Sequence, residues 1–159
     1  MGKTGQNGVY VSSEIIFDLK KQDREFSRAD IEIHNVDHLG PSYEGRVFLN
    51  NTKANINTPK NDRNNYAGSY YIFGHGGCYG DVGHCDFVPG RREYDLRQDS
   101  DVRSQYKYIE ATDLIKKLGR KTNKFTITIV PVLYGNSKEE SIPKTDILKF
   151  EKIGIISYN

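Results

Sequence analysis

The chain has 159 residues, of which 23 are Lys or Arg and 21 are Asp or Glu, so its formal net charge is +2. A chain of this length can bury enough surface to fold as one domain without a metal ion or a disulfide. The basic residues are spread along the sequence, no P-loop occurs, and no apolar run approaches the ~20 residues of a membrane span. Nucleic-acid and membrane partners are therefore disfavoured.

The N-terminus lacks the apolar core of a signal peptide, and we expect a soluble, cytoplasmic protein.

Short segments in which apolar and polar residues alternate predict strands. In chain order, the predicted strands are 9–19, 30–36, 43–50, 66–73, 91–96, 106–109, 125–133 and 148–158. In the third of these, Tyr43, Gly45, Val47 and Leu49 share one face. Segment 51–65 is rich in Asn, Lys and Pro, which predicts a surface loop.

Segment 111–118, with the sequence ATDLIKKL, is the one convincing helix. Thr112 or Asp113 is expected to cap its first turn, and Gly119 suits a left-handed residue after its last turn. About seven or eight strands, one short helix and no internal repeat predict an all-β fold. The expected architecture is an antiparallel β-sandwich, similar to a jelly roll.

Segment 73–85, FGHGGCYGDVGHC, contains both cysteines of the chain, two of its four histidines and five glycines. Glycines let a short loop turn sharply enough to direct several side chains at one point. His75, Cys78, His84 and Cys85 are candidate metal ligands, because thiolate and imidazole suit Cu(I) and Zn(II). Their spacing matches no standard zinc finger, so copper is favoured over zinc, through Cys78, Cys85 and one histidine. Folding of a chain of this length requires neither ion.

The same two cysteines have a purely structural interpretation. An eight-residue loop with several glycines can bring Cys78 and Cys85 into disulfide range, and such a bridge contributes about 2 to 3 kcal/mol in the chain-entropy model. A reducing cytosol disfavours this bridge, and buried or redox-sensing thiols are further alternatives. The residues alone leave the choice open.

Several segments together carry a resemblance to a known family. They are YAGSYYIFG at 66–74, VP at 88–89, RREYDL at 91–96, the short helix, FTITIVPV at 125–132 and SIPK at 141–144 before a final strand. Their order resembles the C-terminal β-sandwich domain that follows the dicopper domain in tyrosinases and molluscan hemocyanins. The likeness covers roughly residues 31–159. The glycine-rich cysteine loop is most similar to the version found in microbial tyrosinase-like proteins.

The resemblance implies a single β-sandwich domain over 1–159, in which 1–29 form an N-terminal strand and a charged connection and 30–159 form the family-like region. In that family the sandwich packs over the type-3 copper domain and limits access to it, and accessory cysteines of some tyrosinases help to load copper. The implied partner is a tyrosinase-like catalytic domain, fused or separate. A type-3 centre needs six histidines on a helical bundle, and this chain has four histidines, so we expect no enzymatic activity from it alone.

A second hypothesis makes the chain an independent module that binds a ligand or a partner. Its surface would be formed by Tyr66, Tyr70, Tyr71 and Tyr79, and its cysteine loop would be purely structural. The two remaining histidines are His34 and His38, which lie around the end of a predicted strand. Two histidines four positions apart would need a helix to bind one metal ion together, so a metal pair is disfavoured. We expect ordinary polar surface roles for both.

Overall fold

The protein is a sandwich of antiparallel sheets. The computed structural model describes residues 3–4, 8–19, 26–74, 104–134 and 147–159. The strands within these ranges are β1 (Lys3–Thr4), β2 (Tyr10–Val11), β3 (Ile15–Ile16), β4 (Arg28–Val36), β5 (Tyr43–Leu49), β6 (Tyr66–Ile72), β7 (Gln105–Glu110), β8 (Lys124–Phe125), β9 (Ile127–Leu133) and β10 (Lys152–Tyr158). A 3₁₀-helix, η2 (Asp62–Asn64), and an α-helix, α1 (Thr112–Gly119), complete the described elements.

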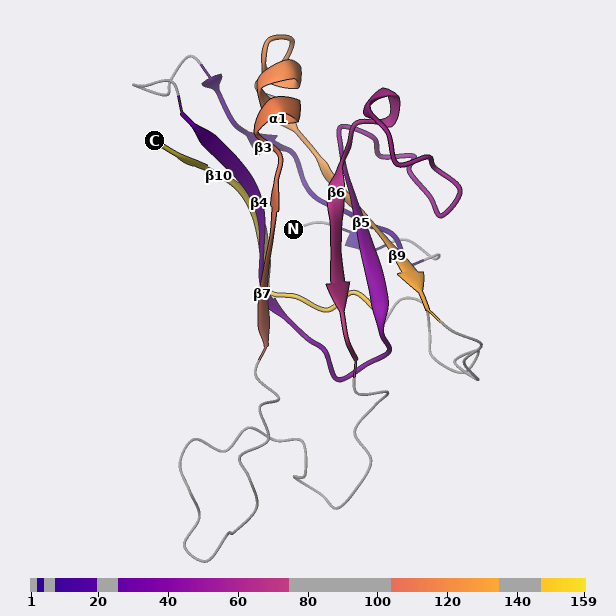
Figure 1. Ribbon diagram of the computed structural model, residues 1–159. Coiled ribbons are helices and arrows are strands. Elements are labelled where there is room, and N and C mark those ends of the chain that lie inside the picture. The colour runs from indigo at the N-terminus through magenta and orange to yellow at the C-terminus, as the bar shows by residue number, and fades with distance from the viewer. Residues whose placement is uncertain (1–2, 5–7, 20–25, 75–103, 135–146) are drawn as a thin grey trace, which may run out of the picture.

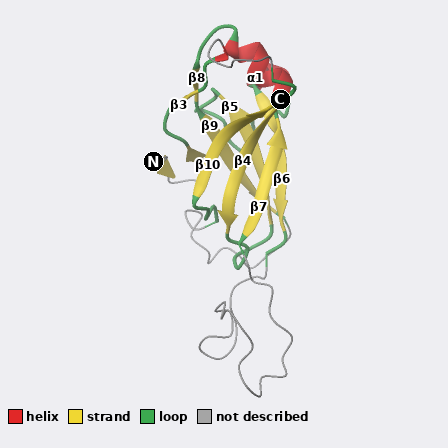
Figure 2. Cartoon of the chain, turned by 90° about the vertical axis from the view of Figure 1, so that its left-hand side faces the viewer, coloured by secondary structure: helices red, strands yellow, loops and turns green. Residues whose placement is uncertain are grey.

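Two sheets face each other across the core. One has the strand order β1-β2-β9-β5-β6 and the other β10-β4-β7, while β3 and β8 form a small third sheet. In Figure 1 the three-stranded and five-stranded sheets stand side by side, with α1 at one end of the sandwich. Figure 2 shows the same helix above the strand ends. The predicted all-β antiparallel sandwich is confirmed.

Alternation of side chains on β4 and β5 builds the core. Ala29, Ile31 and Ile33 of β4 are fully buried, and they pack in one cluster with Val47 and Leu49 of β5. That arrangement confirms the predicted inward face of the 43–50 strand. It follows from the two-residue period of a strand, which places every second side chain on the same face.

The outer faces of both sheets carry buried charged residues, which the alternation alone did not predict. Asp30 and Glu32 lie on the outer side of β4, and Glu44 lies on the outer side of β5, yet none of the three exceeds 5% exposure. Buried carboxylates need hydrogen-bond or ionic partners to remain charged. Their partners therefore locate the polar networks of the molecule.

The predicted strands 9–19 and 125–133 are each interrupted. β2 pairs with β9 and β3 pairs with β8, so both segments break at the same place. The break lies at Thr126, whose backbone N–H donates to Asn50 Oδ1 at 2.7 Å, and Asn50 has a left-handed φ of 50°. The side chain of Asn50 thus replaces one partner of the strand ladder, a contact that comes from a distant loop.

The predicted helix 111–118 is confirmed, with a shift of one residue, but both predicted caps are wrong. Ala111 is the N-cap, and its methyl side chain cannot accept a cap hydrogen bond. Thr112 Oγ1 accepts the backbone N–H of Ala29 at 3.0 Å, so it serves the neighbouring strand instead of the helix. Gly119 is the last helical residue, and Arg120 follows with an ordinary right-handed φ of −66°. A Cβ on Gly119 would lie 2.5 Å from Leu19 Cδ1, so close packing accounts for the glycine.

The other predicted strands agree with the structure or fall outside it. Predictions 30–36, 43–50, 66–73 and 106–109 correspond to β4, β5, β6 and β7, whereas the last strand begins only at Lys152 rather than at 148. Segment 51–65 is a loop that contains η2 and buries Ala54 against Phe48. Segment 91–96 lies outside the described residues. No helix among those described has the length and apolar character needed to cross a bilayer.

Candidate functional site

The proposed metal ligands and disulfide partners fall outside the part of the chain that the structure describes. His75, Cys78, His84 and Cys85, together with Tyr79, belong to segment 75–103. Their roles therefore stay predictions. Within the described ranges, no three or more His, Cys, Asp or Glu side chains are grouped so that they could hold a metal ion.

The two described histidines differ in their surroundings. His34 lies on the outer face of β4, where its Nε2 is 3.0 Å from Glu32 Oε2. His38 follows β4 and is only 5% exposed, so the expected surface role is wrong for this residue. It lies in the turn between β4 and β5, where Asp37 Oδ1 accepts the backbone N–H of Leu39 at 2.8 Å.

The tyrosines proposed as a surface do not all face solvent. Tyr70 is a correction, because its side chain points into the sandwich, is 4% exposed and packs edge-on against Tyr43. A Cβ on Gly45 would lie 2.3 Å from the Tyr70 ring, so the ring fills the space above that glycine. Tyr66 is half-buried against Phe48, whereas Tyr71 is 48% exposed. Of the described candidates, Tyr71 is the one well placed for contact with a partner.

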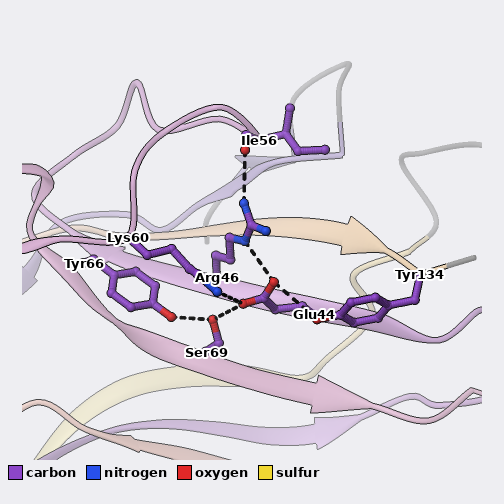
Figure 3. A network of polar contacts seen from close by, with 7 residues as sticks. All are labelled: Glu44, Arg46, Ile56, Lys60, Tyr66, Ser69 and Tyr134. Carbon is purple, nitrogen blue, oxygen red and sulfur yellow. Dashed lines mark hydrogen bonds and ion pairs between the residues drawn. The ribbon is translucent and has the colours of Figure 1, made fainter.

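Glu44 is the centre of a polar network on the outer face of the five-stranded sheet (Figure 3). Its Oε1 accepts from Ser69 Oγ at 2.6 Å and from Lys60 Nζ at 3.0 Å. Its Oε2 accepts from Arg46 Nε at 3.0 Å and from the Tyr134 hydroxyl at 3.4 Å. β5 supplies Glu44 and Arg46, β6 supplies Ser69, and the loop before η2 supplies Lys60. The network therefore fastens a surface loop to two strands.

Two partners of Glu44 make further hydrogen bonds, and together the contacts keep Glu44 ionised. Tyr66 OH and Ser69 Oγ are 2.6 Å apart, and Arg46 also donates to the carbonyl oxygen of Ile56 at 3.1 Å. Burial acts to raise the pKa of Glu44, but hydrogen bonds from Ser69, Lys60 and Arg46 together outweigh it and lower that pKa to about 2. Glu44 is thus ionised throughout the physiological pH range.

Tyr134, which belongs to this network, also forms a pair with a second exposed tyrosine. The rings of Tyr71 and Tyr134 are stacked, with centroids 6.5 Å apart and planes 27° apart, and the two side chains are 48% and 51% exposed. We call them the tyrosine pair. Phe73, which follows β6, is 82% exposed. Exposed, preorganised aromatic rings of this kind are typical of the residues that contribute most to protein interfaces.

Part of the Glu44 network could be predicted from the sequence. Glu44 and Arg46 are opposite charges two positions apart on a predicted strand, so they had to share a face. Lys60 and Tyr134 come from segments far away in the sequence, and no local pattern connects them to Glu44. Tyr134 was missed because it follows the end of a predicted strand.

Comparisons with known proteins identify the fold. No family model matches the chain, and no curated protein matches it. A solved structure of recombinantly expressed latent aurone synthase (polyphenol oxidase) is similar over 95% of this chain and 24% of that chain, with 15% identity and a TM-score of 0.54. The chain shares the fold of that segment. A structure of latent aurone synthase (polyphenol oxidase) from natural source is similar over 96% of this chain and 25% of that chain, with 14% identity and a TM-score of 0.53.

The two matches have a limit that matters for function. The chain spans about a quarter of the length of those polyphenol oxidases, so most of each oxidase has no counterpart here. At 14 to 15% identity the likeness concerns the fold. The sandwich that the resemblance to tyrosinase-type proteins implied is confirmed at that level.

Proposed function

We propose that the chain is a non-catalytic accessory domain of a tyrosinase-like, type-3 copper oxidase. One observation carries the proposal: almost the whole chain shares its fold with one quarter of a latent polyphenol oxidase. In this proposal residues 1–159 form one sandwich domain that packs against the dicopper catalytic domain, fused or separate, stabilises it and shields its entrance. The chemistry of phenol oxidation belongs to that partner.

The tyrosine pair supports a contact on the outer face of the five-stranded sheet. Tyr71 and Tyr134 present aromatic area that is already ordered by mutual stacking, so little side-chain entropy is lost when a partner covers them. Both carboxylate oxygens of Glu44 accept hydrogen bonds, and the network around them supplies an ordered polar rim beside the aromatic contact.

The proposal extends to copper loading through the cysteine loop. Cys78 and Cys85, with His75 or His84, are suited to bind Cu(I) and pass it to the partner. Titration of the reduced chain with Cu(I) tests this step. We expect saturable binding that a Cys78→Ser, Cys85→Ser variant loses. Equal binding by the variant would contradict copper transfer and leave the loop a purely structural role.

The accessory role is tested with the dicopper phenol oxidase domain that is fused to this chain or encoded beside it. We expect the chain to co-elute with that domain in size-exclusion chromatography and to slow its oxidation of a monophenol. A Tyr71→Ser, Tyr134→Ser double variant should bind about tenfold more weakly, as expected for the loss of two aromatic contacts. Ile16→Ser is the matched control, because Ile16 is also exposed but lies on β3.

Two results would overturn the accessory role. One is the absence of any dicopper domain fused to or encoded with the chain. The other is a catalytic domain that neither binds the chain nor changes its rate when the chain is added. Either result would favour the alternative, an independent binding module.

A further inference from the structure

The outer face of the three-stranded sheet carries a second aromatic surface. Tyr106 and Tyr108 of β7 and Tyr158 of β10 are 49%, 55% and 41% exposed, and they flank the central strand β4. The rings of Tyr106 and Tyr108 are stacked, with centroids 6.2 Å apart. This sheet faces the viewer in Figure 2. It lies on the side of the sandwich opposite to the tyrosine pair.

Glu32, on β4 between these tyrosines, differs from the other buried carboxylates. Asp30 is paired with Arg28 at 2.6 and 2.8 Å, and Glu44 is paired with two cations. Glu32 is contacted by the hydroxyls of Tyr158 and Tyr106 and by His34 Nε2, and the histidine is charged only when it is protonated. Among the described residues, Glu32 has no Arg or Lys in ion-pair contact. Within the described part of the chain, it is therefore a buried carboxylate without a permanent counter-charge.

The charge on Glu32 persists nonetheless. Burial acts to raise its pKa, and hydrogen bonds from Tyr158, Tyr106 and His34 outweigh that effect and lower the pKa. Each carboxylate oxygen can accept two hydrogen bonds, so Oε1 and Oε2 retain capacity for another donor. A cationic donor would supply the missing counter-charge as well.

Gly154 leaves an open position beside this carboxylate. It pairs with Glu32 across the sheet, and Tyr108 is the partner of Glu32 on the other side. A Cβ on Gly154 would meet no atom within 4 Å, and Gly154 is not among the residues with positive φ. Neither packing nor backbone conformation requires a glycine here. Glycine weakens the interior of a strand and often marks a place where a ligand approaches closely.

The neighbouring Arg28 shows which cation the tyrosine rings accept. The guanidinium carbon of Arg28 lies 5.2 Å from the centroid of the Tyr108 ring and 5.7 Å from that of Tyr158. A guanidinium is planar, stacks on aromatic faces and donates hydrogen bonds to a carboxylate. An ammonium group offers less stacking area for the same charge.

We propose that the open position over Gly154, beside Glu32, binds the guanidinium group of an arginine side chain presented by a partner protein. Glu32 supplies the complementary charge, and the exposed tyrosine rings supply the stacking surface. The site lies on the other sheet from the tyrosine pair and does not depend on the proposed accessory function.

A peptide titration tests the charge preference. The probe is acetyl-Gly-Arg-Gly-amide, and its neutral match is the same peptide with citrulline in place of arginine. Binding is followed by NMR shifts of tyrosine ring protons. We expect weak saturable binding of the arginine peptide, with shifts confined to Tyr106, Tyr108 and Tyr158. Equal binding of the citrulline peptide would overturn the proposal.

Two variants separate binding from folding. Glu32→Gln should weaken binding of the arginine peptide about tenfold, because a charge-assisted hydrogen bond is lost. Gly154→Val should weaken it similarly by filling the open position, while its higher strand propensity leaves the fold at least as stable. Tyr71→Ser, in the stacked pair on the other sheet, is the control and should bind as the unaltered chain does.

The remaining outcomes are also decisive. Unchanged binding in folded Gly154→Val would place the arginine elsewhere and contradict the site. Binding of free ethylguanidinium without binding of the peptide would contradict a protein side chain as the occupant. Loss of binding in Tyr71→Ser would show that the opposite face is responsible.

Discussion

Glu44 remains charged in a nearly buried position because several donors converge on it. Ser69, Lys60 and Arg46 donate to its two oxygens, and the hydroxyl of Tyr134 lies at the edge of the network. Lys60 is half-exposed, so solvent screens part of its attraction to the carboxylate. The hydrogen bonds from Ser69 and Arg46, which is less exposed, therefore carry more of the stabilisation than the ion pair with Lys60.

The charge of Glu44 makes the stability of the fold depend on acid pH. Its pKa is lowered on folding from an ordinary 4.5 to about 2, so its stabilising effect is fully present above pH 4.5 and is lost as the pH falls to about 2. Glu44→Gln should destabilise the chain at neutral pH by about 1–3 kcal/mol and should lose less stability over that acid window. Urea unfolding at several pH values measures both effects.

Glu110→Gln is the control for this prediction, since Glu110 is an exposed carboxylate on β7. We expect its unfolding curve to follow that of the unaltered chain at each pH. If Glu44→Gln lost as much stability between pH 4.5 and 2 as the unaltered chain, the acid dependence would belong to other carboxylates.

Two glycines in strands should respond oppositely to the same substitution. A Cβ on Gly45 would lie 2.3 Å from the buried ring of Tyr70, whereas a Cβ on Gly154 would meet nothing within 4 Å. Gly45→Ala should therefore destabilise the fold by about 1–3 kcal/mol through overpacking. Gly154→Ala should be neutral or stabilise by about 0.5 kcal/mol. Chemical denaturation of both variants under one condition measures the difference, and equal effects would contradict the packing around Tyr70.

At the scale of elements, α1 is joined to β4 by two hydrogen bonds around one residue. The backbone N–H of Ala111 donates to the carbonyl oxygen of Ala29 at 2.9 Å, and the backbone N–H of Ala29 donates to Thr112 Oγ1 at 3.0 Å. Ala29 is fully buried, so water cannot replace either partner. The hydroxyl of Thr112 thus serves the neighbouring strand rather than the first turn of its own helix.

Thr112→Val tests this junction with little change in side-chain shape. The substitution leaves the buried N–H of Ala29 without its acceptor, and we expect a loss of about 1–3 kcal/mol in the free energy of unfolding. Thr112→Ser keeps the hydroxyl and should retain most of the stability. Thermal and urea unfolding measure the ranking. Equal stability of the valine and serine variants would mean that the hydrogen bond contributes nothing.

The elements that the sequence predicted well are those with a strong local pattern. Strands β4 to β7 and helix α1 follow from alternation or from a short amphipathic run, with boundaries off by one or two residues. The break at Thr126 and the role of Thr112 depend on Asn50 and Ala29, which are distant in the sequence. Tyr70 was misjudged because a tyrosine suits either face of a strand, and the glycine that makes room for it lies on another strand.

At the scale of the whole molecule, the main core draws on both large sheets. Ile31 and Ile33 of the three-stranded sheet belong to the same cluster as Ile127 and Ile129 of the five-stranded sheet and Ile115 of α1. Neither sheet has another apolar layer of comparable size to cover its inner face among the described residues. Each sheet therefore depends on the other for burial, which supports the proposal that residues 1–159 form one domain.

One cooperative unfolding transition is the expected consequence of this shared core. Ile31→Val and Ile129→Val each remove one buried methylene group, in different sheets, and each should lower the free energy of unfolding by about 0.5–1.5 kcal/mol. Because both side chains belong to one core, each variant should shift the same single transition, seen alike by far-ultraviolet circular dichroism and by tyrosine fluorescence. Two transitions, with each variant shifting only one of them, would mean that the sheets unfold independently. In that case the two sheets would not form one cooperative unit.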